Sequence, residues 1–413
     1  PVLNAMGFAA HALGNHEFDY GQDTLRARMR GLHARVLGAN VTYADGRDVE
    51  WIPNDTLIAT PVGTVGVVGL ADPNTPLTTM PAHVADLRFA PLVPVIRRHA
   101  ESLRARGARY VVVVAHEGAF CNIDNPDDCR GDIIEVAREL GRGVVDAIVS
   151  GHTHSAVSTI VEGIPIVQAR SSTRALGVID LPLDSRVPQP RPDVREVKSD
   201  SIVPDPEVGA LVASAVAAVA DRVSAFVVNN ESTLPRRGEQ YALGNLIADA
   251  QRAAGRGDIG VMNNGGIRAD LRAGEVRWGD LHEVAPFANR LVAINARGSE
   301  LAKYFETLVG GSRINVHISG VTIDYDPSAP VGSRVRRVAM ADGRPINPRR
   351  TYRVIMSNFM ASGGDGAGLA GSGAPEEIGI VDLDALIAHL KAAPGGRLVT
   401  TEALTAPRIR AVR

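Results

Sequence analysis

The stretch that decides the fold is YVVVVAHEG at residues 110–118, in which an apolar run ends at His116. A run of β-branched residues is typical of a strand buried on both faces of a parallel sheet. The pattern returns at residues 145–155, VDAIVSGHTHS, where a second apolar run is followed by His152 and His154. Because α/β folds build their sites at the carboxyl ends of such strands, we expect these histidines to contribute to one site.

Further apolar stretches alternate with amphipathic ones around these two strands. We expect additional strands at residues 36–41, 56–60 and 64–70. We expect helices near residues 22–31, 92–106 and 131–142. This alternation predicts a layered α/β domain. Two later stretches are expected to add strands on a second sheet face: residues 164–170 and 175–183.

A change of composition predicts where this domain ends. Residues 184–204 are rich in proline and charge and poor in apolar side chains, which is typical of a domain boundary. We therefore predict a first domain at 1–200, a linker helix at 201–223 and a second α/β domain at 224–413. The second domain contains the helical stretch ALGNLIADAQRAAG, which Gly255 closes as a C-cap, and the strand IGVMN.

Length and composition limit the classes of protein that the chain can represent. The chain has 413 residues, enough for two domains, with 45% hydrophobic and 22% charged residues. These values exclude a wholly disordered, collagenous or coiled-coil chain. No apolar run reaches the roughly 20 residues of a membrane span. The net charge of −2 gives no basic field, so a nucleic-acid duplex is not an expected partner. The oligomeric state is not predicted.

The only two cysteines, Cys121 and Cys129, flank the polar loop CNIDNPDDC. We predict a disulfide that closes this loop, which implies an oxidising compartment. Two unrelated free thiols are the simplest alternative, and a metal site is weaker because no further ligands stand at zinc spacing. The expected location is secreted, periplasmic or at the cell surface, although no signal peptide is visible in the chain.

The motif GNHEFD places Asn15, His16 and Asp19 within five residues. An amide oxygen can bind a metal, and an aspartate can orient a neighbouring imidazole. The alternative for this motif alone is an ordinary capping loop. Together with the histidines at two strand ends, the motif favours a catalytic metal centre. Imidazole and amide ligands suit Zn, Mn, Co or Fe in such a centre, whereas a structural zinc is typically held by thiolates.

GNHEFD, a strand-end histidine and GHTHS, in this order, resemble the calcineurin-like metallophosphoesterases. The stretches NNGGIRADLRAG, WGDLHEVAPFAN and NFMASGGDG extend the resemblance to the 5'-nucleotidase family, which includes ecto-5'-nucleotidases and bacterial periplasmic UDP-sugar hydrolases. The resemblance covers nearly the whole chain. It implies a layered α/β metallophosphoesterase sandwich, with two sheets flanked by helices, that a helix joins to a second α/β domain.

The resemblance also implies two divalent metal ions, drawn from Zn, Mn, Co or Mg. Three residues would bind one ion and the last would bind the other: Asn15, His116, His152 and His154. Two cations about 3.5–4 Å apart can polarise phosphoryl oxygens and generate a hydroxide nucleophile. His16, with Asp19 behind it, would stabilise the phosphate or protonate the leaving oxygen.

In this family the second domain recognises the substrate. Arg237 and Arg268 would contact the phosphate, which the planar guanidinium suits. Phe287 and Phe359 would sandwich the base, although either ring alone could belong to the core. Asp365 would accept hydrogen bonds from the ribose hydroxyls. Three more residues would line the base pocket: Asn263, Gly265 and Asn289.

The chain departs from the family pattern in three places. An Asp-x-His block and a bridging aspartate normally precede GNHE, so we expect the chain to be an N-terminally trimmed piece that by itself could be inactive. Asn264 stands where a third glycine is usual. Glu117 follows His116 where Leu or Ser is usual, which places a carboxylate close to the metals.

These features predict a hydrolase of nucleotide catabolism that converts nucleoside 5'-monophosphates to nucleoside and phosphate. The same metal blocks would also serve a 2',3'-cyclic phosphodiesterase or a hydrolase of UDP-sugars or dinucleotide pyrophosphates. An alternative from another class is a non-catalytic nucleotide-binding surface protein.

Overall fold

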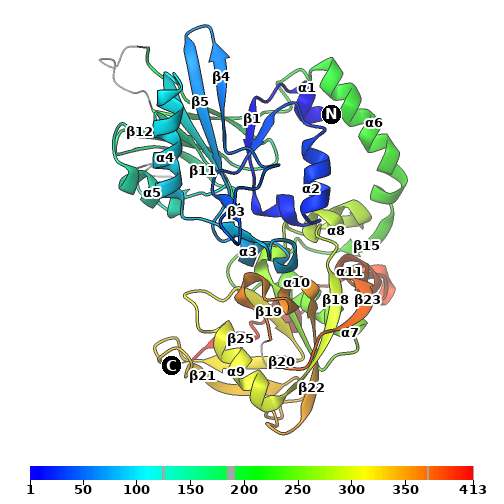
Figure 1. The fold of residues 1–413 in the computed structure, drawn as a ribbon. Helices are drawn as coiled ribbons and strands as arrows, with labels where there is room; N and C mark the ends of the chain where they lie inside the picture. The colour runs from blue at the N-terminus through cyan, green and yellow to red at the C-terminus, as the bar shows by residue number, and fades with distance from the viewer. Residues whose placement is uncertain (123–124, 126, 184–190, 370–371, 413) are drawn as a thin grey trace. The chain divides into compact units, whose positions relative to one another are not determined.

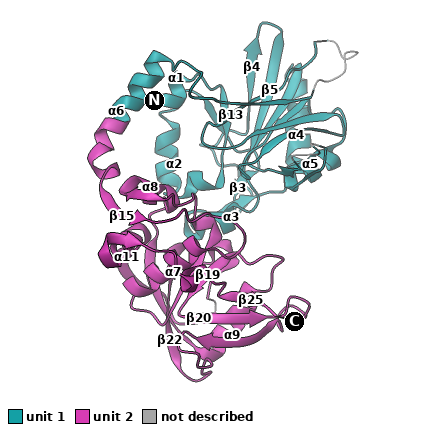
Figure 2. Cartoon of the chain, turned by 180° about the vertical axis from the view of Figure 1, so that it is seen from behind, with its two compact units in different colours: residues 1–215 teal, residues 216–413 magenta. Residues whose placement is uncertain are grey.

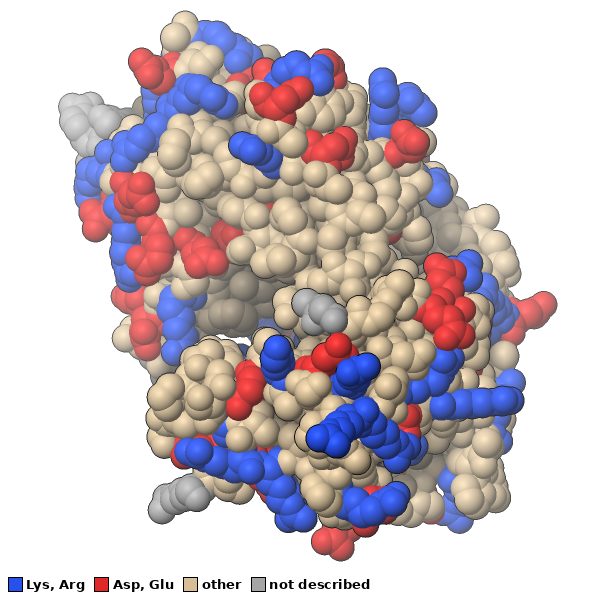
Figure 3. All heavy atoms as spheres, turned by 60° about the horizontal axis from the view of Figure 1, so that its bottom comes forward, with Lys and Arg blue, Asp and Glu red and all other residues tan. Residues whose placement is uncertain are grey.

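The computed structural model describes the chain except for residues 123–124, 126, 184–190, 370–371 and 413. It divides into two compact units, Pro1–Ala215 and Val216–Arg413, which Figure 2 colours separately. No helix in the described part of the chain combines the length and apolar character needed to cross a membrane. On the face shown in Figure 3, acidic and basic side chains are interspersed.

The first unit is built on a six-stranded sheet with the order β11-β12-β10-β7-β5-β4 (Figure 1). Its strands are β4 (Asp55–Thr60), β5 (Gly63–Leu70), β7 (Tyr110–Ala115), β10 (Ala147–Val149), β11 (Ala156–Val161) and β12 (Ile164–Ala169). The four central strands, β5, β7, β10 and β12, pair in parallel, and β4 and β11 add antiparallel edges. The predicted strands at 56–60, 64–70 and 110–115 are confirmed.

Two helices, α4 (Leu92–Ala105) and α5 (Asp132–Leu140), contact each other, and α4 contacts β5 and β7. Both helices carry a strongly apolar stripe, and Ile96 and Ile133 are fully buried in the core they share with the sheet. Burying one such side chain contributes roughly 1.5–3 kcal/mol to the free energy of folding. This core holds the central strands, and therefore the loops that follow them, in place.

The other elements of this unit surround the main sheet. They are α1 (Val2–Ala5), β1 (Ala10–Ala12), η1 (Asn15–Phe18), α2 (Gln22–Met29), β2 (Arg35–Leu37), β3 (Val41–Tyr43), α3 (Thr75–Thr78), η2 (Pro81–His83), β6 (Leu87–Phe89), β8 (Phe120–Cys121), β9 (Cys129–Arg130), β13 (Ala175–Val178) and β14 (Asp193–Glu196). Helix α6 (Pro206–Val223) contains the point of division between the units.

Two details of the sequence prediction were wrong. The single strand expected at 36–41 is interrupted between β2 and β3, where Gly38 packs so closely that a Cβ there would lie 2.9 Å from Leu13 and Ile52. Strand β12, expected on a second sheet face, pairs with β10 in the main sheet because it is buried along nearly its whole length. The boundary stretch 184–204 includes strand β14, which pairs with β13; its residues 184–190 lie outside the described residues.

The predicted disulfide is confirmed. Cys121 and Cys129 face each other across the short antiparallel pair β8–β9, with an S–S distance of 2.00 Å and a Cα–Cα distance of 4.0 Å. No cysteine is left free. Such a bond persists in oxidising compartments and is rare in the reducing cytosol.

The second unit is built on a five-stranded mixed sheet with the order β19-β16-β22-β18-β23, flanked by two three-stranded sheets, β17-β15-β24 and β21-β20-β25. Its strands are β15 (Phe226–Asn230), β16 (Ile259–Asn263), β17 (Gly274–Arg277), β18 (Arg290–Arg297), β19 (Val316–Ser319), β20 (Val321–Tyr325), β21 (Val335–Met340), β22 (Thr351–Ser357), β23 (Glu376–Val381), β24 (Arg397–Leu398) and β25 (Ile409–Ala411). Its helices are α7 (Ala242–Ala254), η3 (Asn264–Gly266), α8 (Trp278–Val284), α9 (Gly298–Leu308), α10 (Asn358–Ala361), η4 (Gly364–Gly366), α11 (Asp382–Lys391), η5 (Pro394–Gly396) and α12 (Glu402–Thr405). The predicted helix capped by Gly255 and the strand IGVMN are confirmed as α7 and β16.

Helix α7 approaches β19 closely at Gly244. The ring of His317 on β19 fills the space beside this glycine and is fully buried. Neither ring nitrogen of His317 has a hydrogen-bond partner among the described residues. Burial, and to a smaller extent the charge of Arg408, lowers the pKa of His317 to about 3, so the ring packs as a neutral aromatic group.

We expect Gly244→Ala to lower the free energy of unfolding by about 1–3 kcal/mol, because the new Cβ would lie 2.1 Å from the His317 ring. Gly209→Ala in α6 is the matched control, since nothing lies within 4 Å of a Cβ at that position. The control should be neutral or slightly stabilising, as alanine is the better helix former. Denaturant unfolding measures both. Equal effects of the two substitutions would contradict this account of the packing.

The carboxyl group of Asp382, the first residue of α11, is also buried. It accepts hydrogen bonds from its neighbour Leu383 N at 2.7 Å and from Asn289 Nδ2 at 3.2 Å. Burial dominates over these bonds and raises the pKa of Asp382 to about 6. The folded protein therefore holds a proton there that the unfolded chain releases at lower pH.

Because this pKa is raised, its contribution to stability is complete below the unfolded value of 3.8 and is lost as the pH rises through about 6. We expect Asp382→Asn, which cannot ionise, to gain stability relative to the wild type between about pH 4 and pH 8, by up to ~3 kcal/mol. Denaturant unfolding at both pH values measures the difference. Asp384→Asn, at the exposed neighbouring carboxylate, should show a much smaller change. If the free energy of unfolding changes with pH equally in the wild type and in Asp382→Asn, the raised pKa of Asp382 is refuted.

Candidate functional site

In the first unit, predicted site residues meet at the carboxyl edge of the parallel strands. His116 directly follows β7, and His152 lies three positions after the end of β10. Their rings face each other, with His152 Nδ1 3.2 Å from His116 Nε2. The side chain of Asn15, in η1, reaches the same point, and its Oδ1 lies 2.9 Å from His116 Nε2. The structure thus brings together three side chains that are up to 137 positions apart (152 − 15).

Asn15 is held in one orientation. Only 2% of the residue is exposed, and its Nδ2 donates to the Thr78 carbonyl at 3.1 Å, which leaves Oδ1 directed at His116. The preceding glycine makes this approach possible, since a Cβ on Gly14 would lie 2.9 Å from the His116 ring. The loop between β1 and α2 is therefore shaped around the histidine.

Burial, followed by the charges of the neighbouring histidines His152, His16 and His154, lowers the pKa of His116 to about 4. The ring is neutral at physiological pH, as a metal-binding imidazole must be. Across the described ranges of the chain, no group of three or more His, Cys, Asp or Glu side chains is arranged to hold a metal. The converging set comprises two imidazoles and one amide, a donor set that suits a divalent metal of the Zn or Mn type.

His16 and Asp19 form the predicted pair, with His16 Nδ1 2.9 Å from Asp19 Oδ2. The other carboxylate oxygen of Asp19 accepts a hydrogen bond from Thr79 Oγ1 at 2.9 Å. Thr79 is 1% exposed, so a buried hydroxyl fixes the carboxylate that orients the histidine. His16 itself has 41% of its side chain exposed, which leaves its ring accessible to a ligand.

His152 and His154 lie on one tight loop, and both have positive φ angles, 69° and 58°. Such angles are uncommon for residues other than glycine and persist only where the surroundings enforce them. Gln168, which is fully buried, donates to Thr153 Oγ1 at 2.7 Å and to the Ser155 carbonyl at 2.8 Å, and so holds this loop. His154 is more exposed than His152, and its charge acts on His116.

The sequence analysis missed Asp72. This residue is 2% exposed, and its Oδ2 lies 3.8 Å from His152 Nε2. Its other oxygen accepts a hydrogen bond from the backbone of Asn74 at 2.7 Å. A signal was present: Asp72 follows β5 as the histidines follow β7 and β10, and all three strands end at one edge of the sheet.

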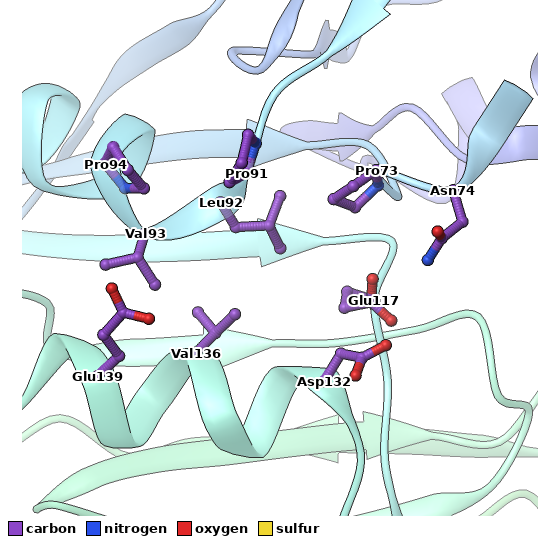
Figure 4. Close-up of a pocket in the computed structure, with 10 residues that line it drawn as sticks. All are labelled: Pro73, Asn74, Pro91, Leu92, Val93, Pro94, Glu117, Asp132, Val136 and Glu139. Carbon is purple, nitrogen blue, oxygen red and sulfur yellow. The ribbon is translucent and has the colours of Figure 1, made fainter.

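Glu117, the unusual residue of the HEG stretch, points away from the solvent. It is 5% exposed, and burial, together with the charge of Asp72, raises its pKa to about 8. Glu117 also lines a cavity of about 380 Å³, where Figure 4 shows its carboxyl group directed toward that of Asp132. The apolar wall of this cavity comes from α4, α5 and the prolines before α4.

In the second unit, five of the eight predicted residues form a connected cluster. Strands β16 and β22 end, and β18 begins, at one edge of the sheet. There Asn263 Nδ2 donates to Asp365 Oδ2 at 2.6 Å, and a Cβ on Gly265 would lie 2.9 Å from the same oxygen. Arg268 donates to the Gly265 carbonyl at 3.2 Å and lies over the ring of Phe287 at 5.6 Å.

The other three predicted residues have different surroundings. The ring of Phe359 packs against Gly364, beside Asp365 in sequence, where a Cβ would be 2.3 Å from the ring. Asn289 Nδ2 is bonded to Asp382 rather than directed at the cluster. Arg237 is exposed on the loop before α7.

Asn264, the residue that replaces a glycine, does not narrow the cluster. Its Nδ2 donates to the carbonyls of Glu239 and Ile314, both at 3.3 Å. The side chain therefore ties two loops together. Asp365 has φ 53° between Gly363 and Gly366, which also have positive φ angles. This left-handed turn aims the carboxylate at Asn263, at a cost of order 1 kcal/mol for a residue with a Cβ.

Comparison with known proteins gives these clusters a context. Residues 215–371 match the family described as 5'-nucleotidase, C-terminal domain. Endonuclease YhcR of Bacillus subtilis is 27% identical over 383 residues, which cover 87% of this chain but 31% of that protein. A snake venom 5'-nucleotidase of Naja atra is 26% identical over 420 residues, which cover 88% of this chain and 76% of the venom protein.

A solved structure has the same fold over nearly the whole chain. The 5'-nucleotidase precursor of Thermus thermophilus superposes with a TM-score of 0.82 at 24% identity, covering 98% of this chain and 83% of that one. The predicted two-domain α/β fold is thus confirmed. The family match lies in the second unit, and the relatives extend the similarity through the first. Residues 215–371 thus match the 5'-nucleotidase C-terminal domain, and the chain is similar to a venom 5'-nucleotidase over most of its length.

Proposed function

We propose that the protein hydrolyses nucleoside 5'-monophosphates to nucleoside and phosphate, using divalent metal ions bound by the first unit. The observation that carries this proposal is the convergence of Asn15, His116 and His152. The set comprises two imidazoles and one amide, and its chemistry fits a metal of the Zn, Mn or Co type. His154, on the same loop as His152, would contribute to the second ion of a two-metal centre.

Bound metal ions would supply Lewis acidity toward the oxygens of a phosphate ester. The role proposed for His16 is to contact a phosphoryl or leaving oxygen, since the ring is exposed and Asp19 orients it through Nδ1. Asp19 stabilises a positive charge on that ring. Thr79 keeps the aspartate in place and makes the pair rigid.

The second unit would bind the nucleoside part of the substrate. Arg268, stacked on Phe287, presents a guanidinium group that suits a phosphate, and the ring beside it would cover one face of the base. Asp365 would accept hydrogen bonds from the ribose hydroxyls. The remaining roles are those expected from the sequence. Arg237 would contact the phosphate, and Phe359 would cover the other face of the base. The base pocket would be lined by Asn263, Gly265 and Asn289.

We also propose that the protein works outside the cytosol, in the periplasm, at the cell surface or secreted. The Cys121–Cys129 disulfide supports this location, and the venom enzyme among the relatives is consistent with it. A catalytic unit at 1–200, a linker helix at 201–223 and a substrate-binding unit at 224–413 are the domains that this function requires.

A second candidate function is the hydrolysis of a phosphodiester. The endonuclease among the relatives favours it, since its name places a diester hydrolase on a related chain. AMP, a 2',3'-cyclic nucleotide, a UDP-sugar and a dinucleotide, tested in one assay series, separate the two candidates. Phosphate release from AMP well above the other rates supports the monoesterase.

We expect removal of metal by a chelator to abolish phosphate release from AMP by the full-length protein, and Mn²⁺ or Zn²⁺ to restore it. His152→Ala should lower kcat/KM by more than about 100-fold, since changes even to the groups behind a metal ligand cost 10–100-fold. His99→Ala is the matched control, because His99 is paired to Asp55 away from the strand ends. The proposed metal centre would be refuted by activity that resists the chelator, or by equal losses of kcat/KM in His152→Ala and His99→Ala.

We expect Asp365→Ala to raise KM for AMP by about 10- to 100-fold, because charged hydrogen bonds to the ribose contribute about 1.5–3 kcal/mol. The metal content should not change, since Asp365 belongs to the second unit. Asp342→Ala, at an exposed aspartate of the same unit, is the control and should leave KM unaltered. An unchanged KM for Asp365→Ala would remove this residue from the substrate site.

A further inference from the structure

The buried carboxylate of Asp72 lies directly behind a proposed metal ligand. Asp72 Oδ2 is 3.8 Å from His152 Nε2, whereas the other ring nitrogen of His152, Nδ1, faces His116. The distance is that of an ion-pair contact and is longer than a hydrogen bond. Asp72 itself belongs to none of the motifs that the sequence analysis singled out.

Asp72 is rigidly placed for such a role. Asn74 N donates to its Oδ1 at 2.7 Å, and the Thr75 hydroxyl donates to its carbonyl at 2.6 Å. One carboxylate oxygen accepts a hydrogen bond from the backbone and the other lies near the ring, and the carboxyl group of Glu117 also forms a side-chain hydrogen bond with Asp72. Since only 2% of Asp72 is exposed, water competes little for the oxygen near the ring.

His152 needs such support because its backbone is in an unfavourable conformation. Its φ of 69° lies in the left-handed region, where a residue with a Cβ is strained. Its side chain is also 31% exposed, so burial alone does not fix the ring. Gln168 donates to Thr153 in the same loop, and a carboxylate oxygen of Asp72 lies 3.8 Å from the ring nitrogen Nε2.

We propose that Asp72 is a positioning residue for His152. Its carboxylate favours the tautomer with the proton on Nε2, so that Nδ1 presents its lone pair toward His116 Nε2. A carboxylate behind a metal-bound imidazole fixes the ring and raises its basicity. This inference rests on the proposed metal site, but the tautomer of His152 is a property of the chain alone.

Two measurements on the full chain test the proposal. Nitrogen NMR of ¹⁵N-histidine-labelled protein without metal reports the tautomer of His152, and titration with Zn²⁺ alone reports affinity. We expect wild-type His152 to carry its proton on Nε2 and Asp72→Asn to lose that preference. The Kd for Zn²⁺ should rise about 10–100-fold in this variant.

Asp55→Asn is the matched control. Asp55 is also a buried aspartate paired to a histidine, with Oδ2 2.7 Å from His99 Nδ1, and it is 10% exposed at the side chain. This substitution removes the same charge from the same unit and should leave both the His152 tautomer and the Zn²⁺ affinity unchanged. If Asp72→Asn does not fold, Asp72→Ser removes the carboxylate while keeping an acceptor for Asn74.

The outcomes separate the two proposals. A wild type that binds no Zn²⁺ argues against the metal site, while the tautomer still decides the role of Asp72. An unchanged tautomer in folded Asp72→Asn overturns the positioning role, whether or not Zn²⁺ binds. The role is also overturned if Asp55→Asn weakens Zn²⁺ binding as much as Asp72→Asn does.

Discussion

The first unit depends on the parallel pairing of β5, β7 and β10. The register places Leu70 beside Ala115, and Val114 beside Val149, so these strands reach the same edge together. The register of the strands alone therefore places the residues that follow them close together. Because the strands are buried among α4, α5 and β12, a register slip would move apolar side chains to the wrong face and is strongly disfavoured. The geometry of the histidines is thus set by the core.

Carboxylates behind imidazoles recur in this unit. Asp19 holds His16, Asp55 holds His99, and Asp72 meets His152. Only two of these three pairs lie at the edge where the strands end, so pairing alone does not mark a site. The second unit uses another device, a left-handed turn that aims Asp365 at Asn263. The two units present their polar groups in different ways, one from strand ends and the other from a glycine-rich turn.

Much of this arrangement was predictable from the sequence, and the exceptions have physical causes. Runs such as YVVVVA predict buried strands, and the histidines after them predict a site, because both follow from local pattern. The assignment of β12 to a second sheet face failed because a short apolar run does not reveal its partner strand. Asp72 was missed because an aspartate before Pro-Asn resembles an ordinary turn. The hydrogen bond between Asn289 and Asp382 could not be predicted from local pattern, because it joins residues 93 positions apart.

The wide spacing of the converging side chains has a consequence for the synthesis of the protein. The contact between Asn15 and His116 closes a separation of 101 positions, and His152 follows 36 positions later. At about 5–20 residues per second, Asn15 leaves the ribosome roughly 7–30 s before His152. Throughout that interval the nascent chain lacks one of the three converging side chains. Their contact can form only late in the synthesis of the first unit, after β7 and β10 have both emerged and paired.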